Sequence, residues 1–226
     1  MDPNFLLIDT STFESSVAVW NGHLKKAEII LGKEKAFAER IPTLVAGLLE
    51  QVQLDLNQLS AIVVNAGPGS YTGLRSGVSF AKGLCYGLKI PLIAVDALLV
   101  LTHKLQHDFK NNNLFLPMID AGRMEVYAAL YTAELLALKD SSPLIVDENF
   151  LQEYQDASLV FFGSGAQKCV DLFKAYPWQY VDGINHTAID FIEPAMVFYK
   201  ANKFSSIHEF EPLYLKEFVP LKKKNG

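Results

Sequence analysis

The sequence predicts an α/β protein, and three features of its first hundred residues support this fold class. Short apolar runs of strand length alternate with longer stretches of helical periodicity, as in folds whose helices cover a partly parallel sheet. The dipeptide Asn21-Gly22 separates two of these runs and is typical of a β-hairpin turn. A turn at Gly67-Pro68-Gly69 follows an apolar run and leads into a long helical pattern.

The elements of the first half follow from these patterns in chain order. Pro42 lies inside the first helical pattern, so that helix should begin near it or bend there. We expect strands at 5–9, 16–20, 24–31, 61–64 and 92–95, and helices at 36–52, 73–88 and 97–105.

The second half is less regular than the first. We expect strands at 114–119, 126–132 and 159–162, and helices at 167–175 and 194–201. The polar run Asn111-Asn112-Asn113 is the best candidate hinge between two parts of the chain. The sequence therefore predicts a first part at 1–110 and a second part at 111–226.

Composition restricts the class of protein. The chain has 226 residues, half of them hydrophobic, and a formal net charge of −5, which argues against a broad basic surface for nucleic acid. Its one basic run, Lys222-Lys223-Lys224, is expected to be a solvated tail. No apolar run is long enough to span a membrane, and the N-terminal residues lack the pattern of a signal peptide. Cys85 and Cys169 lie among apolar residues, as buried thiols do in a reducing compartment, so a cytoplasmic protein is expected.

Polar and glycine-rich turns follow several of the expected strands. The cluster Asp9-Thr10-Ser11 can offer a carboxylate and hydroxyls to a phosphate or its metal, or it can cap its own turn, and both interpretations stay open. The turn Gly67-Pro68-Gly69-Ser70 lacks the Gly-Lys-Ser/Thr ending of a P-loop. A second turn of this kind, Gly163-Ser164-Gly165, suggests a cleft that could hold a nucleotide between two related halves.

Other polar residues give weaker signals. His103 and His107 have metal-ligand spacing on a helix, but no third ligand is evident nearby, so we expect no metal there. Asp120 and Glu125 could act as paired carboxylates or bind Arg123. No activated nucleophile is evident, and no catalytic residue is predicted.

The helix after the first glycine turn has more apolar surface than packing on one side of a sheet requires. Its glycines, Gly73, Gly77, Gly83 and Gly87, each weaken a helix by about 1 kcal/mol relative to alanine and so need a packing reason. A buried core helix explains this pattern, and so does a helix with a partner on its outer side.

Several ordered motifs resemble one bacterial family. The segment Gly67-Pro68-Gly69-Ser70-Tyr71-Thr72-Gly73-Leu74-Arg75-Ser76-Gly77 resembles the Gly-Pro-Gly-Ser-Phe-Thr-Gly-Leu-Arg-Ile-Gly signature of the TsaB family, also called YeaZ. Further family blocks correspond to residues 6–12, 89–95, 120–127, 163–166 and 212–216. Phe37, Gly122 and Met124 depart from the family pattern.

The resemblance implies a fold, a pathway and partners. The fold is the actin/Hsp70-like (ASKHA) α/β fold of two RNase-H-like halves, with the C-terminal half reduced. The pathway makes threonylcarbamoyladenosine beside the anticodon of tRNA, with TsaD as the catalytic subunit and TsaE as the ATPase. The TsaB member is a non-catalytic scaffold that binds TsaD or, alone, a second copy of itself. ATP and metal are then expected on TsaD and TsaE, with no cofactor on this chain.

The resemblance also assigns residues to two surfaces. The expected partner-binding residues are Ile41, Leu44, Val45, Leu48, Tyr71, Leu74, Arg75, Val78, Ser79, Lys82 and Tyr86. The expected vestigial nucleotide-binding residues are Asp9, Thr10, Ser11, Gly67, Gly69, Ser70, Gly163 and Gly165.

A comparison with the TsaD pattern indicates whether this chain could bind the catalytic metal. TsaD binds metal through a His-x-x-x-His pair, and the corresponding positions here are Ala97 and Leu101, which cannot bind a metal. The sequence thus favours the scaffold. The alternative is a stand-alone nucleotide hydrolase or peptidase of the same superfamily. A third hypothesis, direct tRNA binding, is disfavoured by the acidic charge.

Overall fold

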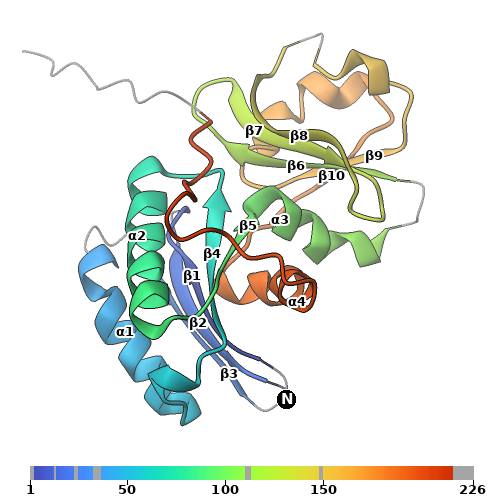
Figure 1. Ribbon diagram of the computed structural model, residues 1–226. Helices are drawn as coiled ribbons and strands as arrows, with labels where there is room; N and C mark the ends of the chain where they lie inside the picture. The colour runs from blue at the N-terminus through green and yellow to red at the C-terminus, as the bar shows by residue number, and fades with distance from the viewer. Residues whose placement is uncertain are drawn as a thin grey trace, which may run out of the picture.

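Two five-stranded sheets with the same strand order form the framework of the protein (Figure 1). The computed structural model describes residues 3–12, 14–22, 25–32, 37–109, 113–147 and 150–215. The first sheet has the order β3-β2-β1-β4-β5, and the second has the order β10-β9-β6-β7-β8. Read from the opposite edge, the second order repeats the first, with β6 in the place of β1 and β9 in the place of β4.

The first half contains all the elements that the periodicity predicts. Strands β1, β2 and β3 pair antiparallel, whereas β1, β4 and β5 run parallel. The bounds are β1 (Asn4–Asp9), β2 (Ser15–Asn21), β3 (Lys25–Leu31), α1 (Phe37–Val52), β4 (Ala61–Gly67), α2 (Tyr71–Leu88), β5 (Leu92–Asp96) and α3 (Ala97–Leu105). Helix α1 begins five residues before Pro42 and continues through it, so the proline neither starts nor ends the helix.

The second half repeats the strands but not the helices. Its elements are β6 (Leu114–Asp120), β7 (Glu125–Tyr131), β8 (Ala137–Ile145), β9 (Leu159–Phe162), β10 (Gln179–Val181) and α4 (Ile192–Lys200). The helix expected at 167–175 is instead two short 3₁₀ helices, Gln167–Cys169 and Leu172–Ala175. Further 3₁₀ helices lie at Leu56–Gln58, Gln106–Asp108, Gln152–Tyr154 and Ala188–Phe191. This is the ASKHA fold of two RNase-H-like halves, with the C-terminal half reduced.

Both faces of the first sheet are covered by helices. Helices α1 and α2 pack on one face, where their buried side chains meet those of β1, β2 and β4. Helix α4 and the 3₁₀ helix before it cover the opposite face (Figure 1). Helix α3 packs against the second sheet through Leu98, Leu101 and Leu105, which contact a cluster that includes Phe115 and Phe162.

The C-terminal part of the chain returns to the first half. After α4 the backbone bonds to β5 through Ser205, whose amide donates to the Leu92 carbonyl at 2.8 Å. It then passes beside α2, where Lys82 Nζ donates to the Phe210 carbonyl at 2.7 Å. We call residues 205–215 the strap (red in Figure 1). The expected division near residue 110 thus separates the two sheets, but α4 and the strap pack on the first sheet although they lie in the second part of the sequence. Asn111 and Asn112 of the expected hinge lie outside the described residues.

The two thiols are buried, as their apolar neighbours predict. Burial raises the pKa of Cys85 to about 12 and that of Cys169 to about 11. Among the described residues, none of the helices combines the length and apolar character that crossing a bilayer requires.

Candidate functional site

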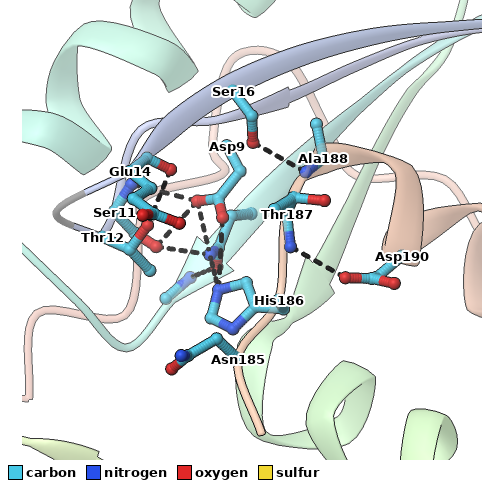
Figure 2. A network of polar contacts seen from close by, with 12 residues as sticks. Asp9, Ser11, Thr12, Glu14, Ser16, Asn185, His186, Thr187, Ala188 and Asp190 are labelled. Atoms are coloured by element: carbon cyan, nitrogen blue, oxygen red, sulfur yellow. Dashed lines mark hydrogen bonds and ion pairs between the residues drawn. The ribbon is translucent and has the colours of Figure 1, made fainter. Parts of the chain in front are cut away.

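A polar network lies where the carboxyl ends of β1 and β4 meet the second half of the chain (Figure 2). Its centre is Asp9, the last residue of β1, which has no solvent-exposed surface. Asp9 Oδ1 accepts hydrogen bonds from the Ser11 amide at 3.0 Å, Ser11 Oγ at 2.8 Å and Asn65 Nδ2 at 3.0 Å. Asn65 in turn fixes the glycine turn, because its Oδ1 accepts from the Gly67 amide at 2.7 Å. The cluster Asp9-Thr10-Ser11 therefore does cap its own turn.

The other oxygen of Asp9 faces a histidine from the far end of the chain. His186 Nε2 lies 3.2 Å from Asp9 Oδ2, and both side chains are buried. Burial alone would raise the pKa of Asp9. The charge of His186 and its hydrogen bond, followed by the bonds from Ser11, outweigh burial and lower that pKa. Asp9 and His186 thus form a buried carboxyl–imidazole pair.

The segment that carries His186 is held to the first half by hydrogen bonds. The Ala188 amide donates to Ser16 Oγ at 2.8 Å, and the Ile189 amide donates to Glu28 Oε1 at 2.9 Å. Lys104 Nζ donates to the Asn185 carbonyl at 3.0 Å. Sequence reasoning missed His186, because it is a lone histidine in an irregular segment and no local pattern marks it.

The second half has a carboxylate in the corresponding place. Asp120 ends β6 as Asp9 ends β1, and its Oδ1 forms an ion pair with Lys168 Nζ. Lys168 also donates to the carbonyls of Arg123 at 2.8 Å and Glu125 at 2.6 Å. A basic side chain of the chain itself therefore faces the carboxylate at the end of the first strand in each half.

Many ASKHA proteins hold a magnesium nucleotide between their halves, and the contacts of these two carboxylates decide whether they could bind its magnesium ion. Magnesium binds through carboxylate oxygens and water in an octahedral shell. Asp9 Oδ1 accepts three hydrogen bonds from the chain, Asp9 Oδ2 faces His186 Nε2 at 3.2 Å, and Asp120 Oδ1 is paired with Lys168. Asp9, which is fully buried among these groups, does not present the hydrated carboxylate oxygens that magnesium prefers.

The network also contains a serine, a histidine and an aspartate, but not in the order of a serine-peptidase triad. In such a triad the serine hydroxyl contacts the histidine, and the carboxylate orients the ring from its other side. Here Ser11 Oγ donates to Asp9 and accepts from Asn65 Nδ2 at 2.6 Å, whereas His186 Nε2 faces Asp9. Among the described residues, the Ser11 hydroxyl bonds to Asp9 and Asn65 and not to a histidine, so the contacts of a serine-peptidase triad are not reproduced.

The two glycine turns face each other across the cleft. Gly69 lies so close to Ser11 that an added Cβ would come within 2.5 Å of the Ser11 Cβ, and Gly165 packs on the backbone at the end of β6. Gly67 and Gly163 both have positive φ, at 106° and 99°. A cavity of about 470 Å³ lies between the turns and is lined by residues that include Ser11, Gly69, Ser70 and Ser164.

Only some of the expected nucleotide-binding residues reach this cavity. Ser11, Gly69 and Ser70 line it, whereas the Thr10 hydroxyl donates to the Gly73 carbonyl at 2.6 Å. Asp9 is buried behind the cavity wall in its pair with His186. Ser164, which belongs to the second glycine turn but was not among the expected nucleotide-binding residues, also lines the cavity.

His103 and His107 are neighbours at the end of α3, with ring centroids 6.0 Å apart. Within the described residues, no group of three or more histidine, cysteine, aspartate or glutamate side chains is placed to hold a metal.

The expected partner-binding residues fall into two groups. The first group is at most 4% exposed and belongs to the chain's own core, so its side chains cannot contact a partner; it consists of Ile41, Val45, Leu48, Leu74 and Val78. Leu44, Tyr71 and Lys82 are half-buried, and Arg75, Ser79 and Tyr86 are exposed.

The glycines of α2 also fall into two groups. A Cβ on Gly73 or Gly77 would collide with Thr10, so these two glycines let α2 approach its own β1 strand. A Cβ on Gly83 or Gly87 would meet no atom within 4 Å. The stripe Arg75, Ser79, Gly83 and Tyr86 therefore runs along the outer side of α2 at helical spacing.

Comparisons with known proteins give the family. A family model described as TsaD, tRNA N6-adenosine threonylcarbamoyltransferase, matches residues 32–152. The chain is 30% identical over 230 residues to the Escherichia coli (strain K12) protein named tRNA threonylcarbamoyladenosine biosynthesis protein TsaB, and the match covers 98% of both chains. The chain belongs to the TsaB family.

Other relatives agree with this membership. The Bacillus subtilis (strain 168) protein of the same name is 34% identical over 162 residues, which cover 70% of this chain and 69% of that one. The solved structure of YeaZ from Pseudomonas aeruginosa matches with a TM-score of 0.79 at 23% identity, over 94% of this chain and 100% of that chain. That likeness supports the fold.

Proposed function

We propose that this TsaB-family chain is a non-catalytic scaffold in the biosynthesis of threonylcarbamoyladenosine in tRNA. It binds a TsaD-type threonylcarbamoyltransferase through the exposed sides of α1 and α2. Membership in a family whose curated relatives are named for this pathway supports the role in the pathway. ATP, metal and the transfer chemistry belong to TsaD and TsaE in this proposal, and the complex acts in the cytoplasm.

The outer stripe of α2 is the observation that carries the proposal. Tyr86 is 71% exposed, and beside it Gly83 and Gly87 face open space. Each glycine costs the helix about 1 kcal/mol relative to alanine, and no contact within the described residues requires it. A partner helix that packs closely against α2 supplies the missing reason. The same stripe pairs two copies of the chain when TsaD is absent.

Two features of the site support a non-catalytic role. Ala97 and Leu101, which stand where the resemblance places the metal-binding histidines of TsaD, are buried in the core between α3 and the second sheet. The carboxylates at the ends of β1 and β6 are paired with His186 and Lys168.

The test is a binding measurement with TsaD of the same organism. Gly83→Arg should weaken binding by at least about tenfold, or 1.4 kcal/mol, because the long side chain holds the two helices apart. The fold should tolerate this change, since arginine favours helix over glycine and the position is open. Gly77 and Val78 are unsuitable test positions because both are buried in the chain's own packing.

Val197→Arg provides the matched control. Val197 is an exposed apolar residue on α4, which covers the opposite face of the same sheet. This variant should bind TsaD as the unchanged chain does. If Gly83→Arg binds with unchanged affinity, the proposed interface is incorrect. Nucleotide or peptide turnover by the purified chain, without TsaD, would favour the hydrolase or peptidase alternative instead.

A further inference from the structure

A groove lies between the outer side of α2 and the strap. The strap runs beside α2 (red in Figure 1) and is joined to it by Lys82 Nζ, which donates to the Phe210 carbonyl at 2.7 Å. The space between them has a volume of about 440 Å³. Its lining includes Arg75, Ser79 and Lys82 from α2 and Phe210, Glu211 and Tyr214 from the strap.

The strap wall of this groove is fixed to the first half of the chain. Ile207 and Phe210 pack against the α1–α2 core. The Leu213 amide donates to the Ala66 carbonyl at the end of β4, at 2.7 Å. A partner therefore meets a groove that is already formed, and it binds without first having to order the strap.

The guanidinium group of Arg75 is held in one orientation inside the groove. Its Cζ lies 5.1 Å from the centroid of the Tyr71 ring, and it also hydrogen-bonds the hydroxyl of Tyr214. The rings of Tyr71 and Tyr214 are 4.7 Å apart. Arginine has five N–H donors in a planar fork that matches a carboxylate. Both tyrosines are neutral, so they orient the guanidinium without balancing its charge.

The positive charge of the groove is not neutralised by the chain. Within the described residues, neither Arg75 nor Lys82 makes an ion pair. Lys82 bonds to a neutral carbonyl and keeps two of its three ammonium protons for another acceptor. Glu211 is the one carboxylate among the lining residues, so two cations stand against one anion.

A partner on the outer stripe of α2 would also cover these cations. Arg75 and Ser79 belong to the same stripe as Gly83, where the proposed function places a closely packed partner helix. A cation that loses its water without gaining an opposite charge costs binding free energy. The partner therefore has to bring negative charge to this end of the stripe.

The spacing of the two cations defines where that charge is needed. Lys82 follows Arg75 by seven residues, so both side chains leave the same face of α2, two turns and about 10 Å apart along the helix axis. The hydroxyl of Ser79 lies between them in sequence and lines the same groove.

We propose that an acidic segment of the TsaD-type partner lies in this groove, with one carboxylate on Arg75 and a second on Lys82. The inference rests on the proposed function and names the chemistry of the partner surface that meets α2. A second copy of the chain is a poorer occupant, because it presents the same excess of positive charge.

Rates of association and dissociation with TsaD of the same organism test the proposal on the full chain. Arg75→Gln and Lys82→Gln should each weaken binding at least about tenfold, the effect of losing about 1.4 kcal/mol. Lys82→Arg keeps the charge and should retain most of the affinity. Lys200→Gln removes an exposed lysine on α4 and is the matched control, which should bind as the unchanged chain does.

Two further measurements separate a charge effect from damage to the strap. Glu211→Gln removes the carboxylate of the groove and should speed association about twofold at low salt. In about 1 M salt, where the Debye length is about 3 Å, this gain should disappear.

Carbodiimide coupling identifies the partner's group directly, because it joins a lysine amine to a touching carboxylate as an amide with loss of water. Mass spectrometry of the coupled complex should show Lys82 joined to an aspartate or glutamate of TsaD, and Lys200 not joined to TsaD.

The proposal is overturned if Arg75→Gln or Lys82→Gln binds as the unchanged chain does, if Glu211→Gln slows association, or if Lys82 is joined to no carboxylate of TsaD. The proposed function survives each of these results as long as Gly83→Arg weakens binding. If Gly83→Arg also binds with unchanged affinity, both proposals are wrong.

Discussion

Two carboxyl groups at the ends of β1 and β5, the strands on either side of β4, have opposite electrostatic surroundings: Asp9 is fully buried and Asp96 is half-buried. Asp9 faces the imidazole of His186, and its pKa is lowered despite burial. Asp96 is the N-cap of α3 and accepts from the Leu98 amide at 2.6 Å and from Ser141 Oγ at 2.5 Å. Burial raises the pKa of Asp96, and these hydrogen bonds only partly oppose it. One carboxylate thus faces an imidazole, and the other is held mainly by neutral donors.

The same isosteric substitution should therefore have opposite effects at the two sites. Asp9→Asn removes the carboxylate that faces His186 and accepts from Ser11 and Asn65, and it should lower the free energy of unfolding by about 3 kcal/mol. Asp96→Asn keeps an N-cap acceptor, removes a half-buried charge and should raise stability slightly, by up to about 1 kcal/mol. Urea unfolding of both variants and the unchanged chain measures the two differences. Equal destabilisation by both would contradict the carboxyl–imidazole pair.

The pH dependence should separate the two groups further. The folded-state pKa of Asp9 lies below the ordinary value of about 3.9, so its stabilisation is complete above that pH and is lost as the pH falls toward the lowered value. The folded-state pKa of Asp96 lies above the ordinary value, so its ionisation costs stability as the pH rises through that window. The difference between Asp96→Asn and the unchanged chain should therefore vanish at a higher pH than the difference for Asp9→Asn. Unfolding series at stepwise pH values test this order.

At the residue scale, the sequence reveals only part of the site. Asp9 and Ser11 stand out because they follow an apolar strand and share one turn. Their partners do not stand out: Asn65 lies within an apolar strand, and His186 is 121 residues farther along the chain. The pairing exists only because the segment after β10 folds back onto β1. No local pattern of residue types encodes that contact.

At the scale of elements, helix α2 uses its glycines in two different ways. Gly73 and Gly77 face inward, where the backbone and side chain of Thr10 occupy the space of a Cβ. Gly83 and Gly87 face outward into open space. The sequence shows four glycines in one helix and suggests close approach to a partner for all of them. The structure restricts that explanation to the outer pair.

Alanine substitutions distinguish the inner pair from the outer pair. Gly73→Ala places a methyl group against the backbone carbonyl oxygen of Thr10, the residue directly after β1, and should cost about 3 kcal/mol. Gly83→Ala meets no atom and should stabilise the isolated chain by about 1 kcal/mol through helix propensity alone. Urea unfolding of the monomeric chain provides the measurement. Stabilisation by Gly73→Ala would show that the helix does not pack on Thr10 as described.

The elements predicted from sequence are those with strong periodicity. The expected helix at 97–105 and the expected strand at 159–162 match α3 and β9. The helix expected at 167–175 is replaced by two 3₁₀ turns, because Cys169 and Phe173 pack into the core beneath the second sheet without continuous helical hydrogen bonding between them. Strand β8 was not predicted because it is an edge strand that contains Pro143 and has mixed exposure. Strand β10 was not predicted because it has only three residues.

At the scale of the whole molecule, the first half depends on the end of the chain. One face of its sheet, which includes Phe5, Leu7 and Ile93, is covered by the 3₁₀ helix at Ala188–Phe191 and by α4. On the other face, Ile207 and Phe210 of the strap pack against the α1–α2 core. A sheet with a large uncovered apolar face does not form a stable domain in water.

The first part of the chain should therefore not fold as a separate unit. A fragment of residues 1–109 leaves the α4 face of its sheet uncovered and should show poor NMR dispersion and binding of a hydrophobic dye. Joining residue 109 through a short flexible linker to residues 184–215 restores α4, the strap and the His186 contact with Asp9. The join is geometrically reasonable because Lys104 Nζ already bonds to the Asn185 carbonyl at 3.0 Å. This shortened chain should show better NMR dispersion and bind less dye than the 1–109 fragment, although α3 loses its packing on Phe115 and Phe162. A well-folded 1–109 fragment would instead show that the first half is independent of the chain that returns to it.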